Sequence, residues 1–241
     1  LSNLKKLNLL NTDRFYSFID DNNNITRLIN NKNFLNGLTC LEELNIQYTK
    51  IKIIQQRNFL ENFRNLKKLT LCINEIENLE PFSFQTLSYL EELDLNFNTI
   101  ELLENNQFSN LKKLKTLKLF NNKINQIEMN SFRDLTNLIK LDLGINDLDF
   151  SDGKNMKIFD SLINLKILCL SKNSIKNLEL GLFDYLINLE ELDLSFNSIK
   201  SLNAKQFQKL INLKFLNLNE NKIESLEIDS LSDLPRLEEL S

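Results

Sequence analysis

The sequence predicts an α/β solenoid, a rod of stacked coils with a parallel β-sheet on its concave side and an irregular convex side. Three observations predict this fold. Leucines restart one pattern about every 24 residues, apolar residues two apart mark a short strand in each unit, and an asparagine usually follows where the chain must turn. The units start at Leu4, Leu41, Leu66, Leu90, Leu114, Leu138, Leu165, Leu189, Leu213 and Leu237.

The clearest unit is residues 189–210, with the sequence LEELDLSFNSIKSLNAKQFQKL. Leu192 and Leu194 are spaced like two inward side chains of a strand. The later apolar residues, spaced by three to five, fit a loosely coiled return segment. Parallel strands need such a crossover, and the usual handedness of the crossover is right. Each unit therefore predicts one right-handed coil.

The pattern LxxLxLxxNxIxxLxxxxFxxL resembles the leucine-rich repeat family, in its 24-residue class with a phenylalanine in the return segment. The resemblance covers essentially all of residues 1–241 and implies a single horseshoe-shaped domain of about ten coils. This class is similar to the ectodomains of Toll-like receptors and related extracellular proteins. The resemblance therefore implies a recognition module.

The first unit departs from the pattern after its strand. Residues 13–24 form an insertion that carries Phe15, Tyr16 and Phe18 among acidic and amide residues. Two interpretations are open: a tolerated surface loop that folds its rings onto the end coil, or a loop that contacts a partner. Asn24 begins an N-glycosylation triplet, NIT, which permits secretion without indicating it.

From the second unit onward, two rows of residues are expected to build the scaffold. The asparagines after the strands should form a ladder, because each amide can bond backbone groups that would otherwise cost about 1–3 kcal/mol when buried. This row is Asn74, Asn98, Asn122, Asn146, Asn173, Asn197 and Asn221, and Thr49 interrupts it. The phenylalanines of the return segments should stack on one another. That row is Phe59, Phe84, Phe108, Phe132, Phe159, Phe183 and Phe207, with Phe59 displaced by a one-residue insertion.

The composition argues against catalytic chemistry. The chain has no histidine, which removes the commonest general base and metal ligand, and it has no glycine-rich phosphate loop. Its three cysteines, Cys40, Cys72 and Cys169, are dispersed and are expected to be unpaired thiols. Cys72 and Cys169 lie four coils apart, roughly 19 Å at the usual strand spacing, which is too far for a disulfide. The sequence predicts a protein that is not an enzyme and has no cofactor or metal site.

Charge and hydropathy narrow the class of partner. The chain carries 29 basic and 33 acidic residues, and a net charge of -4 argues against a general affinity for nucleic acid. No apolar run approaches the ~18 residues of a membrane-spanning helix, so we expect no span within this segment. Neither end shows a polar capping unit, and we therefore expect a segment of a larger protein that lacks both caps.

The outward residues of the strands are the candidate contacts. Stacking the coils should align aromatic and charged side chains on the concave sheet and its rim, a curved surface suited to protein recognition. The candidate residues are Tyr48, Asp94, Phe97, Lys118, Phe120, Asp142, Asp193 and Phe196. For each aromatic residue of the rim, the alternative is a ring partly packed against the next coil.

Two functions follow from these observations. The first is a non-enzymatic recognition module, a ligand-binding segment of a cell-surface or secreted receptor or adhesion protein, which is what the resemblance implies. Its protein ligand would dock on the concave face or on the insertion. The second is an intracellular scaffold or signalling adaptor in the cytoplasm, which the unpaired thiols favour because oxidising compartments tend to pair cysteines. An arm appended to a catalytic domain outside this segment is a further alternative.

Overall fold

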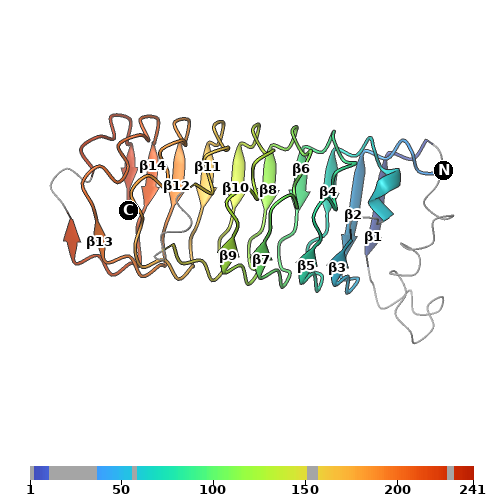
Figure 1. Cartoon of the computed structure of the whole chain (residues 1–241), viewed down its shortest axis with the longest axis horizontal. Coiled ribbons are helices and arrows are strands. Elements are labelled where there is room, and N and C mark those ends of the chain that lie inside the picture. Colours follow the sequence, from blue (N-terminus) through green and yellow to red (C-terminus); the bar gives the residue numbers. More distant parts are fainter. Residues whose placement is uncertain (1–2, 11–36, 56–58, 151–156, 227–230) are drawn as a thin grey trace.

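The computed structural model describes residues 3–10, 37–55, 59–150, 157–226 and 231–241. In these ranges, ten parallel strands form one sheet along the length of the body, and each strand belongs to a different coil (Figure 1). The sheet order is β1 (Lys6–Leu10), β2 (Glu43–Gln47), β4 (Lys68–Thr70), β6 (Glu92–Asp94), β8 (Thr116–Lys118), β10 (Lys140–Asp142), β11 (Ile167–Cys169), β12 (Glu191–Asp193), β14 (Phe215–Asn217) and β16 (Glu239–Leu240).

Neighbouring strands pair at equal positions of the repeat. Leu69 of β4 lies opposite Leu93 of β6, which lies opposite Leu117 of β8. Leu141 and Leu168 keep this register although the unit between them is three residues longer. The predicted solenoid with a parallel concave sheet is confirmed. Each position of the repeat therefore becomes a straight row of side chains across the sheet.

Shorter strands follow the asparagine turn in several coils. They form two-stranded pairs, β3 (Ile53–Ile54) with β5 (Asn78–Leu79), β7 (Leu102–Leu103) with β9 (Gln126–Ile127), and β13 (Ser201–Leu202) with β15 (Ser225–Leu226). Within the described ranges the helical content is one short 3₁₀ turn, η2 (Phe59–Asn62). The return segments are otherwise irregular, as the spacing of their apolar residues predicts.

The core lies between the sheet and the return segments. The inward strand residues, such as Leu93 and Leu95, are fully buried. Behind them the predicted phenylalanine stack is confirmed, with successive ring centroids 6.1 to 6.4 Å apart from Phe84 to Phe207. Such rings add packing energy beyond their buried area.

The side chain of Phe59, which was predicted to begin this stack, lies outside the described side chains, but the backbone of its coil shows which residue holds the ring position. The Phe63 N–H donates to the Leu60 carbonyl, as the Leu87 N–H donates to the Phe84 carbonyl one coil later. Leu60 therefore holds the position of the stacked ring, and Phe63 holds the position of Leu87. Both side chains are fully buried. The two residue types have exchanged places, so the apolar volume of this coil is kept.

The asparagine ladder ties each coil to the one before it. The Asn98 Nδ2 donates to the carbonyls of Leu95 in its own coil (2.9 Å) and Leu71 in the preceding coil (3.1 Å). Its Oδ1 accepts from the Ile76 N–H of the preceding coil (3.0 Å). The same bridging bonds recur at Asn122, Asn146, Asn173, Asn197 and Asn221.

The hydrogen bonds between coils continue at Thr49, where the ladder has no asparagine. Its backbone N–H and its hydroxyl both donate to the Oδ1 of Asn74, each at 2.8 Å. The amide of Asn74 still donates to the Ile46 carbonyl of that preceding coil (3.0 Å). A hydroxyl can therefore take this position when the next coil supplies an amide. The two coils remain linked.

Replacing a ladder amide should destabilise the fold. Asn122→Ala removes two donated bonds, to Leu95 and Leu119, and one accepted bond, from Ile100. We expect the free energy of unfolding to fall by about 1–3 kcal/mol, because these buried backbone groups lose their partners. Urea denaturation of the variant and the wild type measures this free energy. Asn125→Ala makes the same change at an exposed side chain and should be nearly neutral. Equal effects of the two substitutions would contradict the ladder.

Candidate protein-recognition surface

The rim of the concave sheet is a row of residues in left-handed backbone conformation. The residue before each ladder asparagine has a φ of 51° to 55°, as at Phe97 and Phe196, and Tyr48 before Thr49 has a φ of 57°. Here the strand ends, and the chain must turn so that the asparagine points inward. In L-residues this conformation costs about 1–2 kcal/mol, and it is least favourable for the β-branched Ile73 and Ile145. The ladder bonds offset that cost.

The three aromatic side chains of the rim that have this conformation are half-exposed to solvent. The exposed fractions of Tyr48, Phe97 and Phe196 are 52%, 45% and 50%. The alternative, that these rings pack against the next coil, therefore holds only for about half of each ring. Lys172 lies over the ring of Phe196, with its Nζ 5.2 Å from the centroid. The remaining ring surface is available to a partner.

Phe97 and Phe120 form an aromatic pair on the concave side of β6 and β8. Their rings meet edge to face, with centroids 5.6 Å apart. Gly144 lies beside this pair in the next coil, and a Cβ built there would approach Phe120 Cδ2 and Cys169 Sγ to 3.2 Å each. Glycine therefore makes room for the Phe120 ring at this position. Phe97 and Phe120 are two predicted contacts that the structure brings together.

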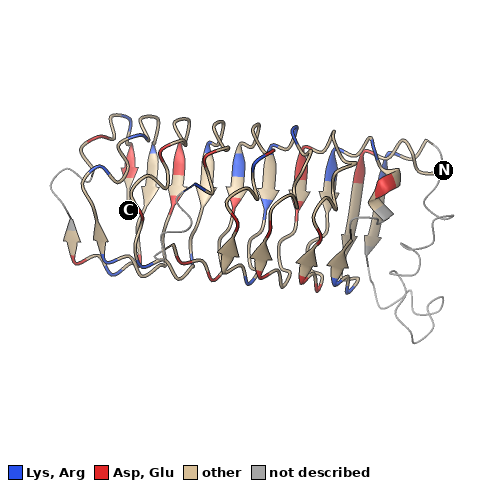
Figure 2. Cartoon of the chain, in the orientation of Figure 1, with Lys and Arg blue, Asp and Glu red and all other residues tan. Residues whose placement is uncertain are grey.

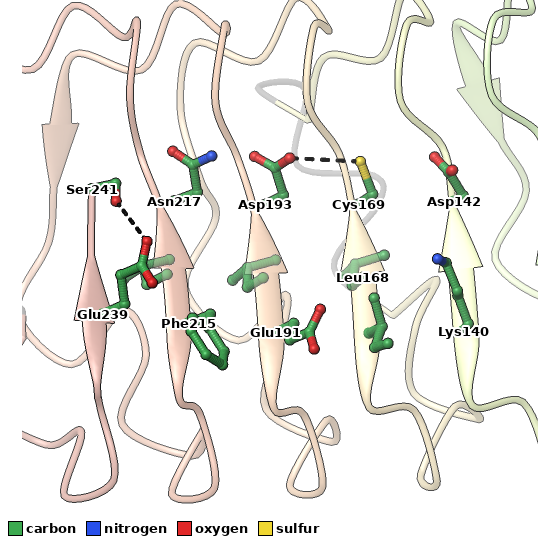
Figure 3. A pocket seen from close by; sticks show the side chains of 13 residues that line it. Lys140, Asp142, Leu168, Cys169, Glu191, Asp193, Phe215, Asn217, Glu239 and Ser241 are labelled. Carbon is green, nitrogen blue, oxygen red and sulfur yellow. Dashed lines mark hydrogen bonds between the residues drawn. The ribbon is translucent and has the colours of Figure 1, made fainter.

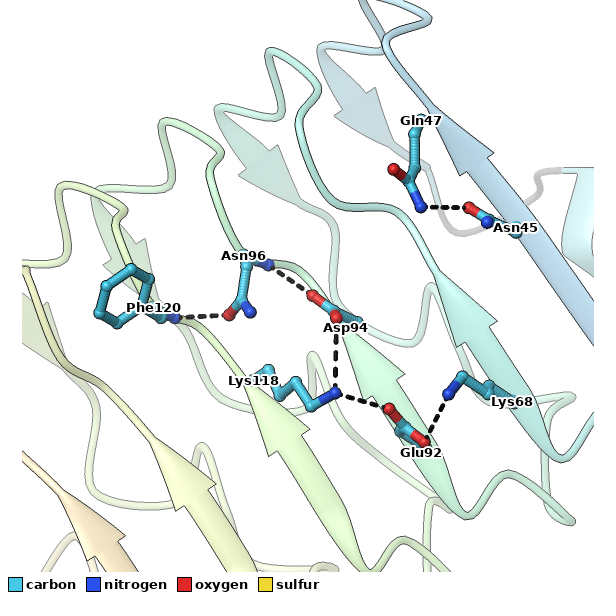
Figure 4. A network of polar contacts seen from close by, with 8 residues as sticks. All are labelled: Asn45, Gln47, Lys68, Glu92, Asp94, Asn96, Lys118 and Phe120. Atoms are coloured by element: carbon cyan, nitrogen blue, oxygen red, sulfur yellow. Dashed lines mark hydrogen bonds and ion pairs between the residues drawn. The ribbon is translucent and has the colours of Figure 1, made fainter. Parts of the chain in front are cut away.

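Asp94 and Lys118 belong to a charged network on the same strands (Figure 4). The Lys118 Nζ lies 2.7 Å from Glu92 and 3.6 Å from Asp94, and Lys68 lies 2.9 Å from Glu92. Burial disfavours the charged forms of Glu92 and Lys118. Their mutual hydrogen bond and the nearby opposite charges outweigh it, so the pKa of Glu92 is lowered and that of Lys118 is raised. Both groups remain charged at neutral pH.

Asp142 and Asp193 lie on either side of Cys169. Asp142 accepts from the Gly144 N–H (3.1 Å), and Asp193 accepts from the Ser195 hydroxyl (2.7 Å). Burial raises the pKa of the Cys169 thiol, and burial together with the charge of Asp94 raises that of Cys72 to about 11. Both thiols are therefore protonated at neutral pH and unreactive as nucleophiles.

The structure thus divides the predicted residues into groups. Asp94, Phe97, Lys118 and Phe120 form one cluster, and Asp142 and Asp193 form a second. Tyr48 and Phe196 stand apart from these at other coils of the rim. The predicted insertion contacts Phe15, Tyr16 and Phe18, and the glycosylation candidate Asn24, lie outside the described residues.

Basic and acidic residues are interspersed along the body (Figure 2), and lysine and glutamate alternate at the residue just before each strand, with Ile139 as the exception. Glu42 pairs with Lys5 (2.9 Å) and Lys67 (2.7 Å), and Glu190 pairs with Lys166 and Lys214 (2.7 Å each). Hydrogen bonds from these lysines lower the pKa of Glu42 and of Glu190 to about 2. The row is Lys5, Glu42, Lys67, Glu91, Lys115, Ile139, Lys166, Glu190, Lys214 and Glu238.

The described residues contain no group of three or more histidine, cysteine, aspartate or glutamate side chains that could hold a metal ion. They also contain no helix that is long and apolar enough to cross a bilayer.

A sequence profile of the leucine-rich repeat matches residues 64–124, 90–148, 153–199 and 187–241. The chain belongs to the leucine-rich repeat family. Leucine-rich repeats of this kind are non-enzymatic interaction scaffolds, so the prediction that the chain is not an enzyme agrees with its family. A comparison with curated protein sequences gave no match.

Three solved structures show the same leucine-rich repeat fold. TLR13, in complex with ssRNA13, is 27% identical with a TM-score of 0.79, over 86% of this chain and 29% of that one. Toll, in the Toll–Spatzle complex of Drosophila, is 22% identical with a TM-score of 0.79, over 87% and 28%. Internalin C2 of Listeria monocytogenes is 23% identical with a TM-score of 0.66, over 87% and 83%. The chain therefore spans less than a third of either receptor chain.

Sequence reasoning missed a second amide ladder of these repeats. The residue before each unit start is often an asparagine, and its Nδ2 donates to a carbonyl of the preceding coil at 2.8 to 2.9 Å. These residues are Asn65, Asn137, Asn164, Asn188 and Asn212. Tyr89 and Lys113 occupy the position in two successive coils, and there the Lys113 Nζ lies 4.0 Å from the Tyr89 centroid. Comparing that one position across all the units would have found the row.

The lysine–glutamate row predicts a dependence of stability on pH. The pKa of Glu190 falls from 4.5 to about 2 on folding, so the unfolded chain takes up this proton at higher pH than the folded chain. The stabilisation is fully present above pH 4.5 and is lost as the pH falls towards about 2. We expect Glu190→Gln to lower Tm at pH 6, and the difference from wild type to shrink below pH 4.5.

Thermal unfolding followed by circular dichroism at several pH values measures this difference in Tm. Glu75→Gln, at an exposed carboxylate of the return side, is the control. Added salt should also reduce the difference at pH 6, because the pairs of Glu190 are exposed. A difference in Tm that stays constant from pH 6 to pH 3 would contradict the role of this ion pair.

Proposed function

We propose that this leucine-rich repeat segment binds a protein ligand on its concave face, as part of the ectodomain of a cell-surface or secreted receptor. One observation carries the binding proposal. Half-exposed aromatic rings stand along a rigid rim, at Tyr48, Phe97 and Phe196, with Phe120 packed beside one of them. Aromatic side chains held in place by the fold contribute much of the energy of protein interfaces, since little side-chain entropy is lost when they bind.

The likeness to TLR13 supports the receptor assignment. It extends over 86% of this chain at 27% identity. The similarity to Toll and to internalin C2 supports the fold, because both identities are below 25%. The insertion, with Phe15, Tyr16 and Phe18, is the second proposed contact for the same ligand.

The charges of the concave face favour a protein ligand over a nucleic acid. TLR13 was solved with ssRNA13. In this chain, by contrast, lysines of the sheet such as Lys68 and Lys118 are paired with carboxylates of their neighbouring strands. The whole chain has a net charge of -4. A phosphate backbone needs free cationic side chains, so it would find few here.

One observation favours a second candidate, an intracellular scaffold. Cys40, Cys72 and Cys169 are all free, and Cys40 is exposed. An exposed unpaired thiol is more typical of a reducing compartment than of the cell surface. The concave face would serve a protein partner in this case too.

The binding proposal predicts a loss of affinity when the aromatic pair is removed. Proximity labelling by the tagged full-length protein, in the cells that make it, should identify partners whose labelling requires Phe97 and Phe120. For such a partner, we expect Phe97→Ala with Phe120→Ala to raise Kd by at least about tenfold. The circular dichroism spectrum should not change, because both rings lie outside the buried core.

Tyr185→Ala with Ile187→Ala is the matched control, because these exposed residues lie on a return segment. Equal affinity of wild type and the Phe97/Phe120 variant would overturn the concave-face proposal. The compartment is tested separately by labelling intact cells with an impermeant biotin reagent. Labelling of the full-length protein supports the receptor, and its restriction to lysed cells supports the scaffold.

A further inference from the structure

The two halves of the concave face differ in how their carboxylates are neutralised. From β1 to β8, each described acidic side chain of the strand rows has a lysine partner within 4 Å. Those residues are Glu42, Glu43, Glu91, Glu92 and Asp94. From β10 to β16, Glu190 is paired in the same way. Asp142, Glu191, Asp193 and Glu239 have no ion-pair partner among the described residues.

These four carboxylates line one hollow of about 400 Å³ on the concave sheet (Figure 3). Lys140 is the one lysine among the side chains that line it, and it lies on β10, two strands away from Glu191. A local excess of negative charge therefore remains in this hollow. Glu191 lies on β12 between β11 and β14 and has no cation on either side, so the described part of this chain does not neutralise it.

An aromatic ring lies between two of the carboxylates. Phe215 of β14 is in register with Glu191 of β12 on one side and Glu239 of β16 on the other. The strand spacing places the three residues roughly 5 Å apart in a line. The ring is 40% exposed, a large fraction for a phenylalanine on a sheet. Ile167 continues the same row one strand beyond Glu191 and adds apolar surface.

The deeper carboxylates are held in place, and the outer pair is free to reach a ligand. Asp193 accepts from the N–H (3.0 Å) and the hydroxyl (2.7 Å) of Ser195, and Asp142 accepts from the Gly144 N–H. Glu239 accepts one long bond from the Ser241 hydroxyl (3.4 Å). Glu191 makes no side-chain hydrogen bond within the described ranges.

We propose that this hollow receives an arginine side chain of a protein ligand, whose guanidinium stacks on Phe215 between Glu191 and Glu239. The proposal rests on the proposed function of the concave face and adds the chemistry of the partner. A guanidinium is planar, stacks on aromatic faces and bonds carboxylates through two parallel N–H groups. An ammonium lacks the planar fork, so a lysine would bind more weakly here. The aliphatic part of the arginine can lie on Ile167.

The charge of the hollow also selects against other occupants. A phosphate or an acidic peptide would meet four carboxylates and one lysine. The partner is therefore a protein that presents a basic loop or helix to coils six to ten. The aromatic pair Phe97 and Phe120, over β6 and β8, would then contact a different part of the same ligand.

The subsite can be tested without the natural ligand by using N-acetyl-arginine amide as the probe. We expect its titration to shift the backbone amide NMR signals of Glu191, Phe215 and Glu239, with saturation on the order of millimolar. Glu191→Gln with Glu239→Gln should raise this Kd by about tenfold, through loss of both charge contacts, and Phe215→Ala should also weaken binding. N-acetyl-citrulline amide, which has the same shape and no charge, should cause no saturable shift.

Glu75→Gln with Glu101→Gln is the matched control, because it removes two exposed carboxylates elsewhere and changes the net charge equally. Equal losses in both double variants would show general electrostatic attraction and overturn the subsite. Binding of citrulline as strong as that of arginine would also overturn it. Such a failure leaves the proposed function intact if the natural partner still requires Phe97 and Phe120. If the affinity of the natural partner does not depend on Phe97 and Phe120, the proposed function is refuted instead.

Discussion

A buried asparagine amide that bridges two coils is the interaction on which the rest of this structure depends. Each amide holds a carbonyl of its own strand, and a carbonyl and an N–H of the coil before, so it fixes how far one coil can shift against the next. That geometry forces the preceding residue into a left-handed conformation. The aromatic side chains of the rim are half-exposed at these turns. The same bonds that stabilise the scaffold therefore present Tyr48, Phe97 and Phe196 to a partner.

Because every coil is held in one register, each charged side chain of the sheet lies beside the side chains at the same repeat position of the neighbouring coils. Lysine and glutamate face each other at the start of the strands, and the Glu92–Lys118 network adds further pairs in the first half. The second half repeats the scaffold but leaves Glu191 and Glu239 without a lysine or arginine partner in the described residues. Rigid packing and incomplete neutralisation occur side by side, and both are properties that a binding surface requires.

The leucine, asparagine and phenylalanine rows could be predicted from the sequence because their period is directly visible. The sequence also placed Asp94, Phe97, Lys118 and Phe120 on one face. It did not show that Lys118 bonds Glu92, since side-chain reach across strands has no signature along the chain. In the sequence, Glu191 and Glu239 stand out only as members of Glu-Glu pairs. Their relation to Phe215 appears only when the third position of each unit is compared between coils. The sequence did not show that Leu60 holds the ring position of its coil, because a one-residue insertion shifts the pattern there.

Because lysine and glutamate alternate from coil to coil, the effect of deleting coils depends on whether an odd or an even number is removed. Lys67 lies between Glu42 and Glu91, so deleting that one coil would bring two glutamates together, whereas deleting two successive coils would keep opposite charges adjacent. Gene rearrangements that change the number of repeats should thus be tolerated better in even steps. Ile139 is the exception, because an uncharged residue accepts either neighbour. A coil on either side of Ile139 can therefore be lost or gained singly, whereas loss of the Ile139 coil itself would bring Lys115 next to Lys166.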